Sequence, residues 1–354
     1  MINFIEQLLP KNIANLTAYS SAKSEKITGS TWLNANESPF SQQISITLDD
    51  LNRYPEPQPE AVINAYAQYS NLNNNQVLMT RGADEGIELL IRTFCIPQQD
   101  SIALFLPTYG MYKVTAESHN VALNALTQAE LQTGSIASLI KEIGTSKLVF
   151  ICNPNNPTGA MVSVDRIREI SVQVGSKTLI VVDEAYIEFC PEQSALSLLE
   201  QCNNIVILRT LSKAFGLAGL RTGFMLSRPE ILAPVRKVIA PYPVSTVVAR
   251  IAENALTPSS ITTMQQQVTD LNQFKQQLIK ECKQSSAIKS VLTGEGNFVT
   301  VELNSVSVLD IAKEMGLIMR PFTLFGSNAW LRISIGNQQE LKQVSIWLDA
   351  INQQ

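Results

Sequence analysis

One lysine stands among small residues directly after an apolar strand. Lys213 follows the predicted strand 204–209, in the run Thr-Leu-Ser-Lys-Ala-Phe-Gly-Leu-Ala-Gly-Leu-Arg that ends eight positions later at Arg221. Partial burial and the second positive charge would both lower the pKa of the amine and supply its neutral form near neutral pH. Such an amine condenses with an aldehyde, so Lys213 is a candidate Schiff-base lysine. A solvated lysine at a helix start is the alternative.

A carboxylate and a phenol follow a second apolar strand. The β-branched run 178–182 ends in Asp183-Glu184-Ala185-Tyr186. Ligands of α/β proteins bind at the carboxyl ends of strands, where Asp183 could hold a pyridine nitrogen protonated. Tyr186 could reach a phenolic oxygen on the same ring. Capping of the next helix is the alternative role for Asp183.

A third strand predicts an anion site. The run 77–80 leads through a predicted loop at 81–86 to an apolar-periodic helix at 87–94. Gly82 and Ala83 offer little steric cover, so the N–H groups at the helix start suit a phosphate, and the helix dipole reinforces this preference.

Two further strand ends contribute an amide and an aromatic ring. The loop 153–159 is stiffened by its prolines and would present Asn156 inward. Tyr109 follows the strand 102–106, where its ring could stack on a planar cofactor. Alone, each is more typical of a turn or of packing, but their order with Asp183 and Lys213 makes the pattern specific.

These motifs together resemble the pyridoxal-phosphate aminotransferases of the aspartate aminotransferase fold type, and more closely the histidinol-phosphate aminotransferases. The resemblance spans nearly the whole chain. It rests also on Leu-Asn-Ala-Asn-Glu at 33–37, Arg-Tyr-Pro at 53–55, Ala-Pro-Tyr-Pro at 240–243 and Leu-Arg-Ile-Ser at 331–334. It implies the reaction of L-histidinol phosphate with 2-oxoglutarate to imidazole-acetol phosphate and L-glutamate, in histidine biosynthesis.

The resemblance also implies how the cofactor, pyridoxal 5'-phosphate, is bound. Lys213 would form the Schiff base, Asp183 would pair with the pyridinium, and Tyr109 would stack on the ring. Tyr186 and Asn156 would contact the ring hydroxyl. The implied phosphate ligands are the backbone of Gly82, Ala83 and Asp84, the side chains of Thr210, Ser212 and Arg221, and Tyr54 from a second subunit.

The implied substrate site is built around an arginine. Arg332, in the Leu-Arg-Ile-Ser motif, would grip the carboxylate of glutamate as a bidentate fork. With Arg320 and Tyr19, it would also bind the phosphate of histidinol phosphate. Asn34 and Asn156 complete the implied set.

The hydrophobic pattern predicts an α/β fold with a second, smaller region. Strands alternate with helices from about 77 to 226, which indicates a mostly parallel sheet with helices on both faces. Helices at 246–255 and 261–282, then strands at 297–303 and 329–335, indicate a small α+β domain. With the resemblance, this predicts the pyridoxal-phosphate-dependent transferase fold type I. We expect an N-terminal arm (1–35) that joins the small domain and the dimer interface, a large cofactor-binding domain (36–243) and a small C-terminal domain (244–354).

Composition excludes several other classes. The 354 residues carry a net charge of −4, without the basic stripe that nucleic-acid binding needs. No apolar run approaches the roughly 20 residues of a membrane helix, and no signal sequence is evident. Five dispersed cysteines and the single His119, expected in a surface loop, suggest neither a disulfide framework nor a metal site. We expect a cytoplasmic homodimer that binds small-molecule substrates.

Three alternatives stay open at this stage. Threonine-phosphate decarboxylases share the fold and most of the motifs, and sequence order does not decide which substrate bond breaks. An aromatic amino acid aminotransferase is possible, because a site that admits both an imidazole phosphate and glutamate is permissive. A cofactor-binding regulatory module is disfavoured, since no helix-turn-helix region precedes the fold.

Overall fold

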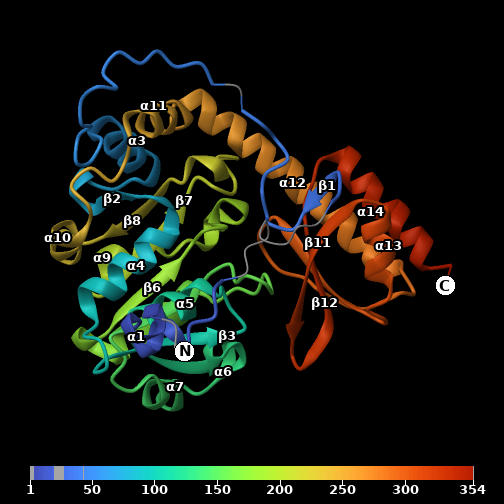
Figure 1. Ribbon diagram of the computed structural model, residues 1–354, viewed down its shortest axis with the longest axis horizontal. Helices are drawn as coiled ribbons and strands as arrows, with labels where there is room; N and C mark the ends of the chain where they lie inside the picture. The colour runs from blue at the N-terminus through green and yellow to red at the C-terminus, as the bar shows by residue number, and fades with distance from the viewer. Residues whose placement is uncertain (1–3, 20–27, 43, 354) are drawn as a thin grey trace.

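The computed structural model describes residues 4–19, 28–42 and 44–353, whose strands form two separate sheets (Figure 1). The larger sheet and its helices, residues 60–255, are called the large unit below. The smaller sheet and the helices beside it, residues 288–351 together with the strand at 31–33, are called the small unit.

The sheet of the large unit has one strand that opposes the others. Among the described residues, its order is β2 (Val77–Thr80), β8 (Gly223–Ser227), β7 (Ile205–Thr210), β6 (Leu179–Asp183), β5 (Leu148–Cys152), β3 (Ser101–Leu106) and β4 (Ala122–Thr127). Neighbours from β7 to β4 are parallel, whereas β8 is antiparallel to both β7 and β2. The central strands β5, β7 and β8 are buried along their whole length, as expected for a sheet covered on both faces.

Helices cover both faces of this sheet. They are α3 (Glu60–Ser70), α4 (Gly82–Phe94), α5 (Met111–Ser118), α6 (Gln128–Thr133), α7 (Ile136–Ile143), α8 (Val164–Val174), α9 (Leu198–Gln201), α10 (Pro229–Val238) and α11 (Thr246–Ala255). Successive strand side chains point to opposite faces. Accordingly, Leu104 and Phe150 join one apolar cluster with α4, α5 and α10, while Phe105 and Ile151 join the other with α3, α7 and α8.

The predicted loop at 81–86 is wrong, because α4 begins at Gly82. Two features explain the early start. Gly82 has a φ of +78°, which glycine adopts without strain. The Glu85 carboxylate accepts a hydrogen bond from the backbone N–H of Arg81 at 2.6 Å and so caps the first turn. The backbone of the predicted anion site is therefore the first turn of a helix.

The small unit is an antiparallel sheet extended by one parallel strand from the N-terminal region. Within the described residues, its order is β1 (Thr31–Leu33), β11 (Leu317–Leu324), β12 (Ser327–Ser334), β10 (Phe298–Leu303) and β9 (Ile288–Leu292). β1 pairs in parallel with β11. The helices α13 (Val308–Glu314) and α14 (Gln338–Ile351) pack against each other beside it, and the 27-residue α12 (Pro258–Gln284) runs from the large unit to the small one (Figure 1).

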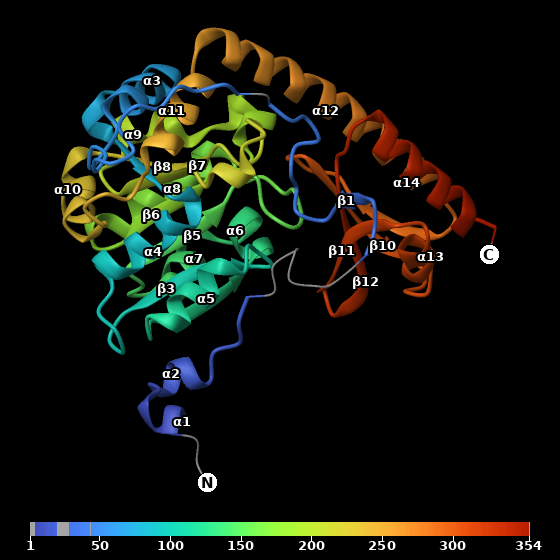
Figure 2. The ribbon, with the colours of Figure 1, turned by 45° about the horizontal axis from the view of Figure 1, so that its top comes forward.

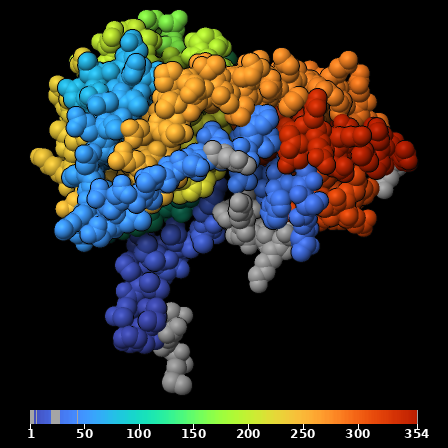
Figure 3. All heavy atoms as spheres, turned by 90° about the horizontal axis from the view of Figure 1, so that it is seen from above, coloured from blue at the N-terminus to red at the C-terminus, as the bar shows by residue number. Residues whose placement is uncertain are grey.

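The N-terminal end of the described chain projects from the body. Figures 2 and 3 show α1 (Phe4–Leu8) extending away from the large unit, whereas α2 (Lys11–Ala14) contacts α5 through Asn12, whose side chain donates to the carbonyl oxygens of Glu117 and Ser118 at 3.2 and 3.0 Å. Phe4 and Leu8 are 68% and 64% exposed. Of the predicted arm, residues 1–3 and 20–27 lie outside the described residues, and the domain boundaries at 35 and 243 stay predictions.

The single histidine and the five cysteines occupy half-buried and buried positions. His119 lies in the turn between α5 and β4, where it is the half-buried C-cap of α5, and its Nδ1 lies 3.0 Å from the Thr115 carbonyl oxygen. All five cysteines, which lie within the described residues, are buried and free of disulfides. In the described part of the chain, no helix is both long and apolar enough to span a bilayer.

Candidate active site

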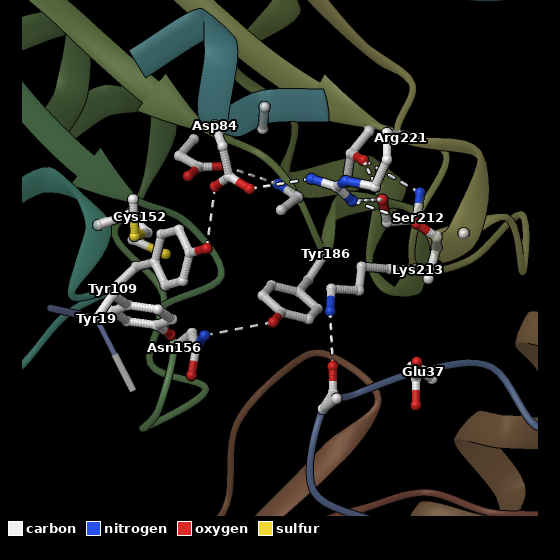
Figure 4. A pocket seen from close by; sticks show the side chains of 18 of the residues that line it. Tyr19, Glu37, Asp84, Tyr109, Cys152, Asn156, Tyr186, Ser212, Lys213 and Arg221 are labelled. Atoms are coloured by element: carbon white, nitrogen blue, oxygen red, sulfur yellow. Dashed lines mark hydrogen bonds and ion pairs between the residues drawn. The ribbon is translucent and has the colours of Figure 1, made fainter. Parts of the chain in front are cut away.

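A cavity of about 600 Å³ opens where the strand ends of the large unit face β12 of the small unit (Figure 4). Its walls collect most of the residues that the sequence singles out. Those that line it are Tyr19, Ala83, Asp84, Tyr109, Asn156, Asp183, Tyr186, Thr210, Ser212, Lys213, Arg221 and Arg332.

Lys213 is held near the centre of this cavity. Its side chain is half-buried, and Nζ donates a hydrogen bond to the carbonyl oxygen of Ala35 at 2.8 Å and lies 5.6 Å from the ring centre of Tyr186. Burial, followed by the charge of Arg332 and, to a smaller extent, Arg221, lowers the pKa of the amine to about 8. Its neutral form is therefore accessible near neutral pH, which agrees with the chemistry expected of a Schiff-base lysine.

Asp183 is the last residue of β6 and is only 3% exposed. Tyr112 donates its hydroxyl to Oδ2 at 2.6 Å, and the backbone N–H of Ala185 donates to Oδ1 at 3.1 Å. Burial raises the pKa of the carboxyl group to about 6, although both hydrogen bonds oppose this rise. Because the Asp183 carboxylate is buried and poorly hydrated, its negative charge would strongly stabilise a cationic nitrogen placed beside it.

Glu184, the next residue, faces away from the cavity and joins two strand ends. Its carboxylate pairs with Arg209 near the end of β7, with Nη2 and Oε2 2.8 Å apart and side chains 5% and 0% exposed. Ser194 and the backbone N–H of Ala195 also donate to it. This buried network ties the ends of β6 and β7, which carry Asp183 and the segment to Lys213.

The anion end of the cavity lies at the first turn of α4. Arg221 pairs with the Asp84 carboxylate there at 3.0 Å and donates to the Ser212 hydroxyl at 3.4 Å. A Cβ atom at Gly82 would lie 2.7 Å from Arg221 Nη2, so any other residue there would displace the guanidinium from its present position. Backbone N–H groups, a hydroxyl and a guanidinium thus converge, as an anion site requires.

Tyr109 and Thr210 support this end from either side. The Tyr109 hydroxyl donates to Asp84 at 3.0 Å, which makes the Asp84 side chain, and not only its backbone, part of the site. Thr210 Oγ1 accepts a hydrogen bond from the backbone N–H of Ser212 at 3.1 Å and donates to the Thr222 carbonyl. Thr210 therefore orients the turn that precedes Lys213.

The opposite wall contains the half-buried side chain of Arg332. Arg332 Nη1 donates to the Asn156 side-chain oxygen, and Nη2 donates to the carbonyl oxygen of Asn34 at 2.8 Å. Asn156 in turn donates to the Tyr186 hydroxyl at 3.4 Å. The buried Nε–H of Arg332 has no hydrogen-bond partner among the described residues. Burial lowers the pKa of the guanidinium.

Four predicted residues occupy different positions relative to this wall. Tyr19 lines the cavity, with its ring edge-on to Tyr109; burial raises the pKa of its hydroxyl, against the opposing charges of Arg332 and Arg320. Arg320 lies on β11 directly opposite Arg332 in the antiparallel pair, outside the cavity lining.

Asn34 and Tyr54 also lie outside the lining. Asn34 is buried, and its backbone carbonyl oxygen accepts the hydrogen bond from Arg332. Tyr54 is 82% exposed and stacks on Tyr242 with ring centres 4.5 Å apart.

Comparison with known proteins decides the family. Residues 20–345 match the model of aminotransferase class I and II. The chain is 43% identical to the histidinol-phosphate aminotransferase of Pectobacterium atrosepticum over 349 residues, 98% of each chain. The chain belongs to the histidinol-phosphate aminotransferase family.

Solved structures share the fold of this aminotransferase. The histidinol-phosphate aminotransferase of Sinorhizobium meliloti in complex with pyridoxal-5'-phosphate superposes with a TM-score of 0.85 at 22% identity, over 98% of this chain and 97% of that one. The L-threonine-O-3-phosphate decarboxylase of Porphyromonas gingivalis has a TM-score of 0.71 at 18% identity, covering 85% and 93%. At these identities, the structures establish the fold alone.

The donors that line this aminotransferase's cavity fit pyridoxal 5'-phosphate. A lysine with a lowered pKa, a buried carboxylate with a raised pKa and an anion end are each present. The absence of a side chain at Gly82 keeps the anion end open. These groups would meet the aldehyde, the pyridine nitrogen and the phosphate respectively.

Sequence reasoning missed several residues of the aminotransferase site. Tyr112 lies in the first turn of α5, where nothing distinguishes it from the other tyrosines of the chain. Asn36 has a left-handed φ of 52°, donates to the Tyr186 hydroxyl at 3.0 Å and places Ala35 and Glu37 in the cavity wall. The motif at 33–37 contains Ala35, Asn36 and Glu37 and could have pointed to them, but the sequence analysis names only Asn34 from it as a site residue.

Proposed function

We propose that this aminotransferase transfers an amino group between L-histidinol phosphate and 2-oxoglutarate, with pyridoxal 5'-phosphate as cofactor, in histidine biosynthesis. The observation that carries the proposal is the 43% identity to a histidinol-phosphate aminotransferase over 98% of both chains. The composition of the cavity supports it independently, because it offers a basic amine, a buried carboxylate and two guanidinium groups.

When bound, pyridoxal 5'-phosphate supplies an aldehyde for the substrate amine and an electron-withdrawing ring. Lys213 would provide the amine that removes the proton from the substrate Cα and returns it, and its pKa of about 8 suits this exchange. Asp183, whose carboxylate is fixed by Tyr112, would hold a proton on the ring nitrogen. Tyr186 and Asn156 would bind the ring's hydroxyl oxygen, while Ser212, Arg221 and the first turn of α4 would bind the phosphate.

Arg332 explains how one site accepts two different anionic substrates. Its planar fork, which lines the cavity, would bind either the carboxylate of glutamate or the phosphate of histidinol phosphate. Tyr19, which lines the cavity, and Arg320, the register partner of Arg332 on β11, would contribute to the phosphate end. Asn34 holds Arg332 through its carbonyl oxygen.

The proposal includes a homodimer in which Tyr54 completes the partner's site. Support comes from the 82% exposure of Tyr54 and from the exposed apolar residues of α1 and α2. Large apolar side chains exposed together mark interaction surfaces. Mixing an inactive Tyr54 variant with an inactive Lys213 variant tests the sharing: activity restored in mixed dimers supports it, and no restoration contradicts it.

The substrate is tested by competition among the three chemistries. Initial rates are measured with L-histidinol phosphate, with aromatic amino acids and with L-threonine phosphate, and carbon dioxide release is followed in the last case. We expect the highest kcat/KM for L-histidinol phosphate and no carbon dioxide. A higher kcat/KM for an aromatic amino acid, or decarboxylation of threonine phosphate, would replace the proposed substrate.

A further inference from the structure

The loop that carries Asn156 belongs to the large unit in sequence, yet the small unit holds it. Thr300, buried on β10, donates its hydroxyl to the Pro157 carbonyl oxygen at 2.5 Å. Thr300 is the register partner of Arg332 on β12, whose guanidinium binds the Asn156 side chain. Thr300 and Arg332, neighbours in the small sheet, therefore donate hydrogen bonds to the successive loop residues Pro157 and Asn156.

A second contact fixes the other end of this loop. The backbone N–H of Glu295 donates to the Gly159 carbonyl oxygen at 2.7 Å. Gly159 and Gly294 meet backbone against backbone, and a Cβ atom added at Gly294 would overlap the Gly159 carbonyl group. No side chain separates the two segments, so a displacement of the turn at 294–295 is transmitted to the loop directly.

A buried lysine holds that turn. Lys275 lies on α12 and is 2% exposed. Its Nζ donates to the Gly294 carbonyl oxygen at 3.0 Å and pairs with the Glu295 carboxylate at 3.3 Å. Burial of an ammonium group costs free energy unless its hydrogen bonds are satisfied, so these contacts are specific features of the fold. α12 is also the helix that joins the two units (Figure 1).

We propose that Lys275 is a positioning residue for the reaction. It acts through the turn at 294–295 and through Gly159 on Asn156, and so sets the distance between the ring-hydroxyl contact and the substrate-binding Arg332. Its kinetic consequence rests on the proposed function, whereas its effect on the bound cofactor does not. Neither the motifs of the active site nor its lining includes Lys275.

The test compares Lys275→Met with Lys280→Met, an exposed lysine on the same helix. In the cofactor-loaded protein without substrate, the absorbance of the cofactor is titrated with pH. An amide N–H donated to the ring oxygen stabilises its anionic form, so a displaced Asn156 should raise the midpoint by about one unit in Lys275→Met. Lys280→Met should titrate as the wild type does.

Kinetics give the second readout. We expect kcat with L-histidinol phosphate to fall up to about 100-fold in Lys275→Met, since small misplacements near the reacting groups have effects of this size. KM should change less, because Arg332 is retained. Lys275→Arg keeps a cationic hydrogen-bond donor, so its titration midpoint and its kcat should both lie closer to the wild-type values than those of Lys275→Met.

Gly294→Ala separates positioning from folding. It leaves Lys275 in place but forces the turn away from Gly159, so it should raise the same titration midpoint. A wild-type midpoint in folded Lys275→Met overturns the inference. Where Lys275→Met does not fold, a wild-type midpoint in folded Gly294→Ala overturns it instead. Failure of the wild type to use L-histidinol phosphate would contradict the proposed substrate only, and the titration would still decide the role of Lys275.

Discussion

The two halves of the cavity are built in different ways. The half proposed to bind the cofactor, called the cofactor half, consists of strand ends and turns of one sheet, with Asp183 ending β6 and Ser212 and Lys213 following β7. The half proposed to bind the substrate, called the substrate half, brings together Tyr19, the segment 34–37 and Arg332, which are far apart in sequence and lie outside that sheet. The first half is positioned by sheet geometry and the second by contacts between units.

Because of this difference, the two halves should respond differently to a single substitution. The ends of β6 and β7 are locked by the buried pair of Glu184 and Arg209, so a change at one cofactor contact should leave its neighbours in place. Arg332, by contrast, binds both the Asn156 side chain and the Asn34 carbonyl, so its replacement should disturb several segments together. Four substitutions test this contrast.

The largest effect is expected from Lys213→Ala in the cofactor half. Turnover should fall by about 10⁴-fold or more, because proton transfer and exchange of the substrate amine both need this group. Cofactor should still bind through Asp183 and Arg221. Steady-state rates and equilibrium dialysis measure the two outcomes, and multiple-turnover activity near the wild-type rate would refute the assigned role.

Arg332→Lys should have the next largest effect, in the substrate half. Lysine keeps the charge but loses the planar fork, so kcat/KM for both L-histidinol phosphate and 2-oxoglutarate should fall by about 100-fold. Arg250→Lys, in an exposed ion pair on α11, is the matched control. If only one of the two substrates were affected, the shared-anion role of Arg332 would be wrong.

Asp183→Asn should change stability in a pH-dependent way. The folded pKa of about 6 lies above the ordinary value of 3.8, so the group's stabilising contribution is present below pH 4 and is lost as the pH rises through 6. The cofactor-free variant should therefore gain about 2–3 kcal/mol over the wild type between pH 4 and 7.5. Urea unfolding at both pH values measures this gain, and a pH-independent difference would contradict it. Cofactor affinity of the variant should fall.

Tyr112→Phe should have the smallest effect. Loss of its 2.6 Å hydrogen bond removes stabilisation of the Asp183 carboxylate, whose pKa should rise further. Cofactor affinity should fall by about tenfold, as for one hydrogen bond to a charged group. Tyr69→Phe, on α3 in the other apolar cluster, is the control; equal losses in both variants would show a general packing effect instead.

The cofactor half could largely be predicted from the sequence, because each element is an apolar strand followed at once by polar residues. Asp183, Asn156 and Lys213 follow this rule, and strand ends of one parallel sheet meet at one edge. The start of α4 was misplaced because the loop-like composition of Gly82 to Gly86 concealed a helical turn.

The substrate half and its supports could be predicted only in part. Arg332 and Tyr19 came from the family resemblance. Tyr112 contacts a residue 71 positions away and Asn36 one 150 positions away, and no local pattern encodes such pairs. Lys275 appears in the sequence as one more polar residue of a polar helix, and only the packing of α12 against the turn at 294–295 makes it a buried donor.

The central claim is that Lys213, acting at a bound pyridoxal 5'-phosphate, exchanges the amino group of L-histidinol phosphate. The most direct measurement is a single half-reaction, in which the cofactor-loaded protein is mixed with L-histidinol phosphate and the cofactor absorbance is followed together with formation of pyridoxamine phosphate. We predict rapid conversion that 2-oxoglutarate reverses, and no conversion on this timescale in Lys213→Ala. An unchanged spectrum in the wild-type protein would contradict the account.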